Sequence, residues 1–175
     1  MSITTSSSEF EKNLEPMLEI FLHDTPCCIA LENVVRILPL MALQPIPKSP
    51  AHIKGMFSLS GESVCVIDLV EYSGLSHNKP YSIDTEVILC SYKSRLCGLI
   101  ASQLGNMSQV QSDDVQMADD FKEANPLFHG VVETEKGLSL LLDLEFILSF
   151  CKMLDKKALK NTPAELLSKA KSEIL

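Results

Sequence analysis

Two serines and a carboxylate bring elements of hydrolytic chemistry into the segment "IKGMFSLSGESVCVIDL", residues 53–69. Ser58 and Ser60 lie next to a glycine, and Asp68 closes an apolar run where it could act as a general acid or base. A nucleophile elbow of the form G-x-S-x-G needs glycine two positions before the serine, but Met56 and Ser58 occupy those positions. A carboxylate at the end of a strand more often caps the turn or helix that follows. The segment therefore predicts strand residues and no catalytic residues.

The other residues that could do chemistry do not combine into a familiar site. The four histidines are scattered through predicted loops and include no i, i+4 pair for zinc: His23, His52, His77 and His129. Four aspartates lack the spacing of a calcium loop: Asp113, Asp114, Asp119 and Asp120. All seven glycines are isolated, so no glycine-rich loop can bind phosphate. We expect no metal and no cofactor.

The cysteines are predicted to pack in the interior as small apolar side chains. Six occur, mostly inside apolar runs and without a C-x-x-C spacing: Cys27, Cys28, Cys65, Cys90, Cys97 and Cys151. Free cysteine in such a run behaves as a small hydrophobic residue. Cys27 and Cys28 are neighbours on a predicted strand and should point to opposite faces, which prevents them from sharing a metal or a disulfide.

Length and charge exclude several classes of protein. The chain has 175 residues, the size of one ordinary domain, and 46% of them are hydrophobic. A net charge of −8 argues against nucleic acid as a partner. The longest apolar tract, residues 138–148, is interrupted by Asp143 and Glu145 and is shorter than the roughly 20 residues of a membrane span, so we expect no membrane insertion. The first residues lack the pattern of a secretion signal, which predicts a cytoplasmic protein.

Short apolar runs separated by turn-forming residues predict a mainly β fold. The runs form two groups of similar texture on either side of the polar segment 76–84, without a repeat of fixed period: 17–22, 27–31, 33–41, 56–61 and 63–69, then 85–92, 96–102, 103–110, 131–137 and 138–144. The run 63–69 is apolar on both alternating faces, which predicts burial on both sides. Residues 111–130 predict an acidic loop.

The period changes near the C-terminus. Apolar residues recur there at helical spacing, which predicts one buried helix face: Leu144, Ile147, Leu148, Cys151 and Leu154. Thr162-Pro163-Ala164-Glu165 is a capping box, so a last helix should begin at Thr162. Its modest apolar content favours a loosely docked tail over a helix dedicated to a partner.

Residues 17 to about 148 resemble the CheW-like domain family, the scaffold proteins of bacterial chemotaxis arrays. The resemblance begins with "MLEIFLHDTPCCIAL" and "VVRIL", where the family tends to have V-x-E-I. Its most specific part is "SPAHIKGMFSLSGESVCVIDL", where the family has P-x-x-I-x-G-x-x-x-x-R-G-x-x-x-P-V-x-D-L. The stretches "LCGLIASQLGNMSQV" and "FHGVVETEKGLSLLLDLEFIL" are similar to the family's second half.

The resemblance implies a mainly β fold of two small SH3-like five-stranded β-barrels packed together, with a C-terminal α-helix or helices and no enzymatic activity. The expected parts are a flexible polar tail at 1–16, a CheW-like domain with two barrel subdomains at 17–150, and a helical extension at 151–175. Family members join the regulatory domain of a CheA-type histidine kinase to the cytoplasmic tip of chemoreceptors.

Six residues form the predicted partner-binding surface: Val34, Arg36, Ile37, Ser60, Gly61 and Glu62. Val34, Ile37 and the Ser60-Gly61 turn are placed there by the resemblance. Arg36 stands where the family has Glu, and Ser60 where it has Arg; two acidic positions of the second half are Ser102 and Asn106. In the family this Glu and this Arg look able to pair with each other, and here both are replaced. Removing one member of a buried ion pair costs about 3 to 5 kcal/mol, whereas losing both can be nearly neutral. We hypothesise that Arg36 pairs instead with Glu62.

Three functions follow from these observations. The first is a chemotaxis adaptor that couples receptors to the kinase. The second is a divergent CheW-like protein of a pilus or other chemosensory system that binds only one of these partners, which the changes at Arg36 and Ser60 favour. The third is a small β-barrel hydrolase, whose site would have to include Ser58 or Asp68.

Overall fold

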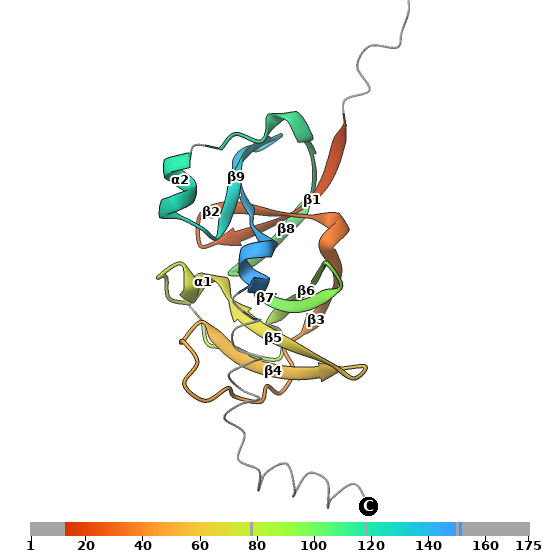
Figure 1. The fold of residues 1–175 in the computed structure, drawn as a ribbon, viewed down its shortest axis with the longest axis vertical. Coiled ribbons are helices and arrows are strands. Elements are labelled where there is room, and N and C mark those ends of the chain that lie inside the picture. The colour runs from red at the N-terminus through yellow and green to blue at the C-terminus, as the bar shows by residue number, and fades with distance from the viewer. Residues whose placement is uncertain (1–12, 78, 118, 150, 152–175) are drawn as a thin grey trace, which may run out of the picture.

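The structure is a computed structural model that describes residues 13–77, 79–117, 119–149 and 151. Its ten strands form two five-stranded sheets, drawn one above the other in Figure 1. Sheet A has the order β8 (Gln103–Gln111), β1 (Leu14–Leu22), β2 (Thr25–Ala30), β10 (Gly137–Leu142) and β9 (Phe128–Thr134). Sheet B has the order β3 (Val34–Pro39), β6 (Glu86–Tyr92), β7 (Arg95–Ile100), β5 (Glu62–Asp68) and β4 (Ile53–Leu59). The predicted mainly β fold is confirmed.

Each sheet combines antiparallel hairpins with one parallel pair, β2 with β10 in sheet A and β7 with β5 in sheet B. An isolated bridge joins Gln44, which follows β3, to Met56 on the opposite edge strand of sheet B. A second bridge joins Gln116, which follows β8, to Val131 on the opposite edge strand of sheet A. The continuous ladders of the described strands do not close either sheet, so the SH3-like barrels stay a prediction.

Tight turns with positive φ at both loop residues connect two of the hairpins. The β4–β5 turn has φ of 51° at Ser60 and 85° at Gly61, and the β6–β7 turn has φ of 48° at Lys93 and 62° at Ser94. Two-residue loops with positive φ at both positions have the twist that joins neighbouring antiparallel strands without splaying them. The exposed glycine turn predicted at Ser60-Gly61 is confirmed, but Ser60 is a turn residue and only Ser58 lies in a strand.

The two sheets share their largest core. Sheet A contributes side chains of β1, β2, β9 and β10, and sheet B contributes side chains of β4 to β7. The cluster also includes α1 (Leu69–Tyr72) and the helical residues after β10, namely Leu144, Ile147, Leu148 and Cys151. Cys27 belongs to this shared core, whereas Cys28 belongs to a smaller core with Met17 and Val132. Adjacent strand residues therefore face opposite sides, as predicted. The run 63–69 is confirmed as buried from Val64 onward, but strand β5 ends at Asp68 and Leu69 begins α1.

Short helices connect the strands: η1 (Leu31–Asn33), α1 (Leu69–Tyr72), η2 (Ser112–Asp114) and α2 (Asp119–Ala124). The expectation of a plain acidic loop at 111–130 is wrong, since this segment contains η2, α2 and the start of β9. Residues 144–149 and 151 are helical, which confirms the start of the predicted helix. Strand β1 begins at Leu14, inside the range predicted as a tail. Leu154 and the predicted helix at Thr162 lie outside the described residues.

Candidate partner-binding surface

Strand β3 carries three of the predicted partner-binding residues on an edge of sheet B. Val34 is half-buried and packs against the shared core, whereas Arg36 is exposed and Ile37 is 42% exposed. The register with β6 shifts between Val34 and Arg36, so Val35 is a bulge residue and is 52% exposed. An edge strand with exposed apolar side chains offers backbone and side-chain contacts to another chain.

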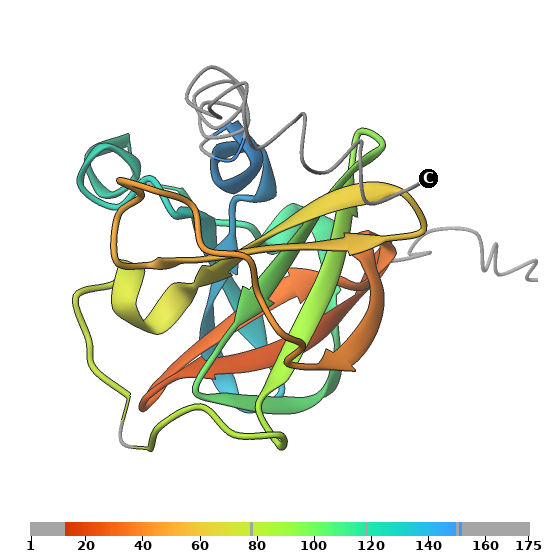
Figure 2. The same ribbon diagram turned by 90° about the horizontal axis from the view of Figure 1, so that it is seen from below.

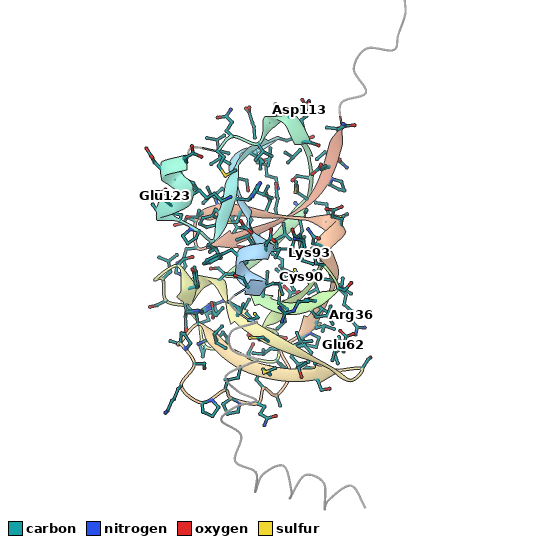
Figure 3. The ribbon with its side chains drawn as sticks, viewed as in Figure 1. Arg36, Glu62, Cys90, Lys93, Asp113 and Glu123 are labelled. Carbon is teal, nitrogen blue, oxygen red and sulfur yellow. The ribbon has the colours of Figure 1, made fainter. Side chains whose placement is uncertain are left out.

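The other three predicted residues lie at the tip of the β4–β5 hairpin, where Ser60, Gly61 and Glu62 are all exposed. Figures 1 and 2 both show this tip on the same side of the molecule as β3, and Figure 3 shows Arg36 and Glu62 on that side of the sheet. Glu62 also lines a cavity of about 170 Å³ whose other walls include Arg95. Arg36 and Glu62 therefore lie on the same side of sheet B, whereas the register from Ile37 through Ile88 and Leu99 places Ile37 level with Ile67, near the other end of β5.

The hypothesis of an Arg36–Glu62 ion pair is not supported by the structure. Ion pairs of the described residues include Lys54 with Glu71, Lys93 with Glu145, Lys136 with Glu19, and two histidine–aspartate contacts, and none of these pairs involves Arg36 or Glu62. The physical reason is the strand order, because β6 and β7 lie between β3 and β5 in the sheet. Glu62 is the first residue of β5, and the Ser60-Gly61 turn connects it to β4.

Sequence reasoning missed three exposed apolar residues, one on β3 and two beyond or beside its C-terminal end. Val35, Met41 and Ile83 are 52%, 39% and 86% exposed. Ile83 lies in a turn where the Ser82 N–H donates to Thr85 Oγ1 at 2.9 Å, and the Thr85 carbonyl accepts from the Leu40 N–H at 2.8 Å. Alternation along β3 could not reveal Val35, because a bulge breaks the alternation.

Asp68 caps α1, as its position at the end of a strand predicted. Its Oδ1 accepts from the N–H groups of Val70 at 2.9 Å and Glu71 at 3.1 Å. Its Oδ2 is hydrogen-bonded to Nε2 of His77 at 2.5 Å and accepts from the hydroxyl of Tyr81. Burial, followed by the hydrogen bond to Asp68, raises the pKa of Tyr81. Asp68 is fully buried, so this arrangement holds the chain and leaves the carboxylate no open face for a substrate.

The remaining chemistry-bearing residues are not gathered around Asp68. His129 lies beside Asp143, with 3.8 Å between Nδ1 and Oδ2. Ser58 is opposite Ser63 in the β4–β5 ladder. Within the described ranges, no group of three or more His, Cys, Asp or Glu side chains is arranged to hold a metal ion.

Buried thiols occupy the two cores. Burial raises the pKa of Cys27 and Cys90 to about 12 and that of Cys28 to about 11. Burial also raises the pKa of Cys97 well above its ordinary value. Because the thiolate is the nucleophile, these four groups are protonated and inert at neutral pH.

We expect iodoacetamide at pH 8 to label these four cysteines in the folded protein at least about 100-fold more slowly than in urea, since burial suppresses the thiolate. Peptide mass spectrometry after timed labelling measures the rate at each residue. The same chain in urea is the control. Equal rates in both conditions would contradict the burial of these thiols.

The strand arrangement is that of a known class of domain with two five-stranded sheets. The chain superposes on the crystal structure of the scaffolding protein TtCheW from Thermoanaerobacter tengcongensis with a TM-score of 0.64 and 18% sequence identity, covering 74% of this chain and 84% of that one. At this identity the likeness shows the fold. The CheW-like domain family matches residues 16–151, and the chain belongs to that family.

Two curated relatives extend the comparison. The chain is 22% identical over 149 residues to the chemotaxis protein CheW of Rhizobium meliloti (strain 1021), which covers 83% of this chain and 94% of the relative. It is 21% identical over 144 residues to the chemotaxis protein CheW of Helicobacter pylori (strain ATCC 700392 / 26695), which covers 82% of this chain and 87% of the relative. Together with the family match, these relatives support an adaptor or scaffold role in chemotaxis. In the described part of the chain, no helix has the length and apolar character needed to cross a membrane.

Proposed function

We propose that this chain is a non-enzymatic adaptor that couples chemoreceptors to a CheA-type histidine kinase in bacterial chemotaxis. Membership of the CheW-like family supports this function. The observation that carries the proposal is the exposed apolar edge of β3. Ile37, at a position that the family resemblance assigns to contacts, is 42% exposed, and Val35 beside it is 52% exposed. An adaptor works by binding, and its affinity depends on such exposed anchors.

The kinase regulatory domain and the cytoplasmic tip of a chemoreceptor are the two partners in this proposal, and the protein acts in the cytoplasm without inserting into the membrane. The net charge of −8 disfavours nucleic acid as a further partner. We also infer that each sheet forms a small SH3-like barrel. The bridges from Gln44 to Met56 and from Gln116 to Val131 support this inference, because each bridge links the chain after one edge strand to the opposite edge strand.

A second candidate function is a CheW-like protein of a pilus or other chemosensory system that binds only one partner. The exposure of Arg36 and Ser60 favours it, because both residues depart from the family pattern and both lie on the predicted contact surface. A changed charge on an exposed rim alters the choice of partner more than it alters folding.

Titration of the full chain with a kinase regulatory domain and, separately, with a receptor-tip fragment tests both functions. Binding of both partners supports coupling, and binding of one supports the single-partner function. We expect Ile37→Glu to weaken binding of at least one partner about 30-fold, because it places a charge in an apolar contact. Isothermal titration calorimetry measures the change.

Leu138→Glu is the matched control, since Leu138 is 67% exposed but lies on β10 of sheet A. Its affinity for that partner should stay within a factor of about two, as expected for a substitution outside the contact. Equal weakening by both variants, or by neither, would contradict the assignment of β3. Hydrolysis of ester or phosphate substrates that is lost in Ser58→Ala or Asp68→Asn would instead favour an enzyme.

A further inference from the structure

The chain has two structurally equivalent halves. The first runs from β1 to α1, and the second runs from β6 through β10 to the helical residues after it. In the first half, Leu18 of β1 pairs with Ile29 of β2; in the second, Ile88 of β6 pairs with Leu99 of β7, each residue 70 positions later. The third strands are equivalent as well, because Ile37 pairs with Ile88 in one sheet and Met107 pairs with Leu18 in the other. Both third strands have a register shift beside that pair.

The last strands of each half are equivalent at a separation of 75 positions. The Asp68 N–H donates to the carbonyl of His52 at 2.8 Å, and the Asp143 N–H donates to the carbonyl of Leu127 at 2.8 Å. Both aspartates then cap a helix, Asp68 at Val70 and Asp143 at the Phe146 N–H. A glycine three residues after His52, and its counterpart three residues after Leu127, each lie against the backbone of the bridging glutamine.

Neither half completes a sheet by itself. Sheet A joins β1 and β2 of the first half to β8, β9 and β10 of the second, and sheet B joins β6 and β7 of the second half to β3, β4 and β5 of the first. The shared core likewise takes side chains from both halves. The contacts between halves are therefore the same whether one chain or two chains supply them, which is the condition for exchange between copies.

The segment between α1 and β6 connects the two halves. Its length decides whether a half packs against the other half of its own chain or against that of a second chain. Its described residues, 73–77 and 79–85, run along the outside of the molecule between α1 and β6 (Figure 2). Its first fixed point is Leu75, whose N–H donates to the Val70 carbonyl, and its last is Thr85, whose carbonyl accepts from Leu40. The nine residues between them, 76–84, can span about 30 Å when extended.

Contacts with the first half shorten this reach. The Ser76 carbonyl is hydrogen-bonded to Nε2 of His23 at 2.7 Å, and both His77 and Tyr81 are hydrogen-bonded to the buried Asp68. The Tyr81 ring also lies 5.5 Å from Nζ of Lys54. We call His77, Tyr81 and Asp68 the clamp. With the clamp in place only residues 82–84 remain between the fixed points, and three residues span about 10 Å at most.

We propose that this chain can form a dimer by exchanging halves with a second copy, and that the clamp keeps the connection short and selects the closed monomer. In the exchanged dimer, each pair of sheets contains the first half of one chain and the second half of the other. The ion pair between Glu19 of β1 and Lys136, 2.8 Å apart, then joins two chains, because Glu19 belongs to the first half and Lys136 to the second.

Deletion of residues 77–84 tests the proposal in the full chain. Ser76 is then joined directly to Thr85, with about 3.8 Å between their Cα atoms, which is too short for the path around the monomer. We expect light scattering after size exclusion to show twice the monomer mass for this variant.

A carbodiimide condenses the Glu19 carboxylate with the Lys136 amine to an amide, the released water being taken up by the reagent. In a mixture of ¹⁴N and ¹⁵N chains refolded together, this crosslink should join peptides of different isotope.

His77→Ala/Tyr81→Phe is the milder variant and decides the question where the deletion does not fold. Refolded at increasing protein concentration, it should yield an increasing dimer fraction with the same mixed-isotope crosslink. Ile83→Ala, on the connection but outside the clamp, and the unchanged chain should stay monomeric under the same conditions. A folded monomer from the deletion, a dimer with only same-isotope crosslinks, or a clamp variant that is monomeric at every concentration would overturn the proposal.

Discussion

Asp68→Ala is expected to lower the free energy of unfolding by about 3 kcal/mol, one of the largest effects of any single substitution in this chain. The carboxylate is fully buried and accepts from the N–H groups of Val70 and Glu71, which cap α1. Losing a cap alone costs about 1 kcal/mol. The remainder comes from His77 and Tyr81, whose polar groups lose a charged partner. Urea denaturation followed by circular dichroism measures the loss.

Asp143→Ala is the matched control, because it caps the equivalent helix of the second half. Asp143 accepts from the Phe146 N–H at 2.9 Å, its contact with His129 is longer at 3.8 Å, and its side chain is 15% exposed. We expect a loss of about 1 kcal/mol, the cost of a cap. Equal losses for the two variants would show that the contacts of Asp68 to the connection contribute no stability.

Local signals in the sequence were enough to predict the elements around Asp68. The run ending at Asp68 is apolar on both faces, and the structure buries it from Val64 onward. The Ser60-Gly61 turn, to which the family resemblance pointed, lies between two apolar runs, and its positive φ values are those of a tight hairpin turn. These features depend on residues within one turn or one strand, where propensity and alternation act directly.

The equivalence of the two halves left little trace in the sequence. Between the paired segments only four residues are identical, namely Cys27 with Cys97, Gly55 with Gly130, Asp68 with Asp143, and Leu69 with Leu144. The separation also changes from 70 positions in the first three strands to 75 in the last two. A search for one fixed period therefore fails, because backbone pairing conserves strand register and tolerates almost any apolar side chain.

The candidate partner-binding surface could be predicted only in part from the sequence. The resemblance led to β3 and to the β4–β5 turn, which lie on the same side of the molecule in Figures 1 and 2. It could not predict the neighbours of Arg36, since these depend on β6 and β7 lying between β3 and β5. The contacts of Tyr81 with Asp68 join residues 13 positions apart through an irregular segment, which no periodic pattern marks.

Gly55→Ala is expected to destabilise the fold by about 3 kcal/mol, because two independent costs add at this position. Its φ of 138° lies in a region that residues with a Cβ rarely adopt, and an added Cβ would lie 2.6 Å from the backbone carbonyl oxygen of Gln44. That oxygen accepts from the Met56 N–H at 2.8 Å, so moving it away breaks the bridge between the chain after β3 and strand β4. Thermal and urea denaturation measure the loss.

Two other glycines separate the two costs. Gly130→Ala brings a Cβ within 2.9 Å of the Gln116 carbonyl oxygen without a positive φ, and Gly137→Ala meets no atom within 4 Å but has a φ of 121°. We expect each to cost about 1 kcal/mol, the steric cost alone in the first and the conformational cost alone in the second. If Gly55→Ala cost no more than either control, the close approach of Gln44 to β4 would be adjustable and the bridge would contribute little to holding the edges of sheet B together.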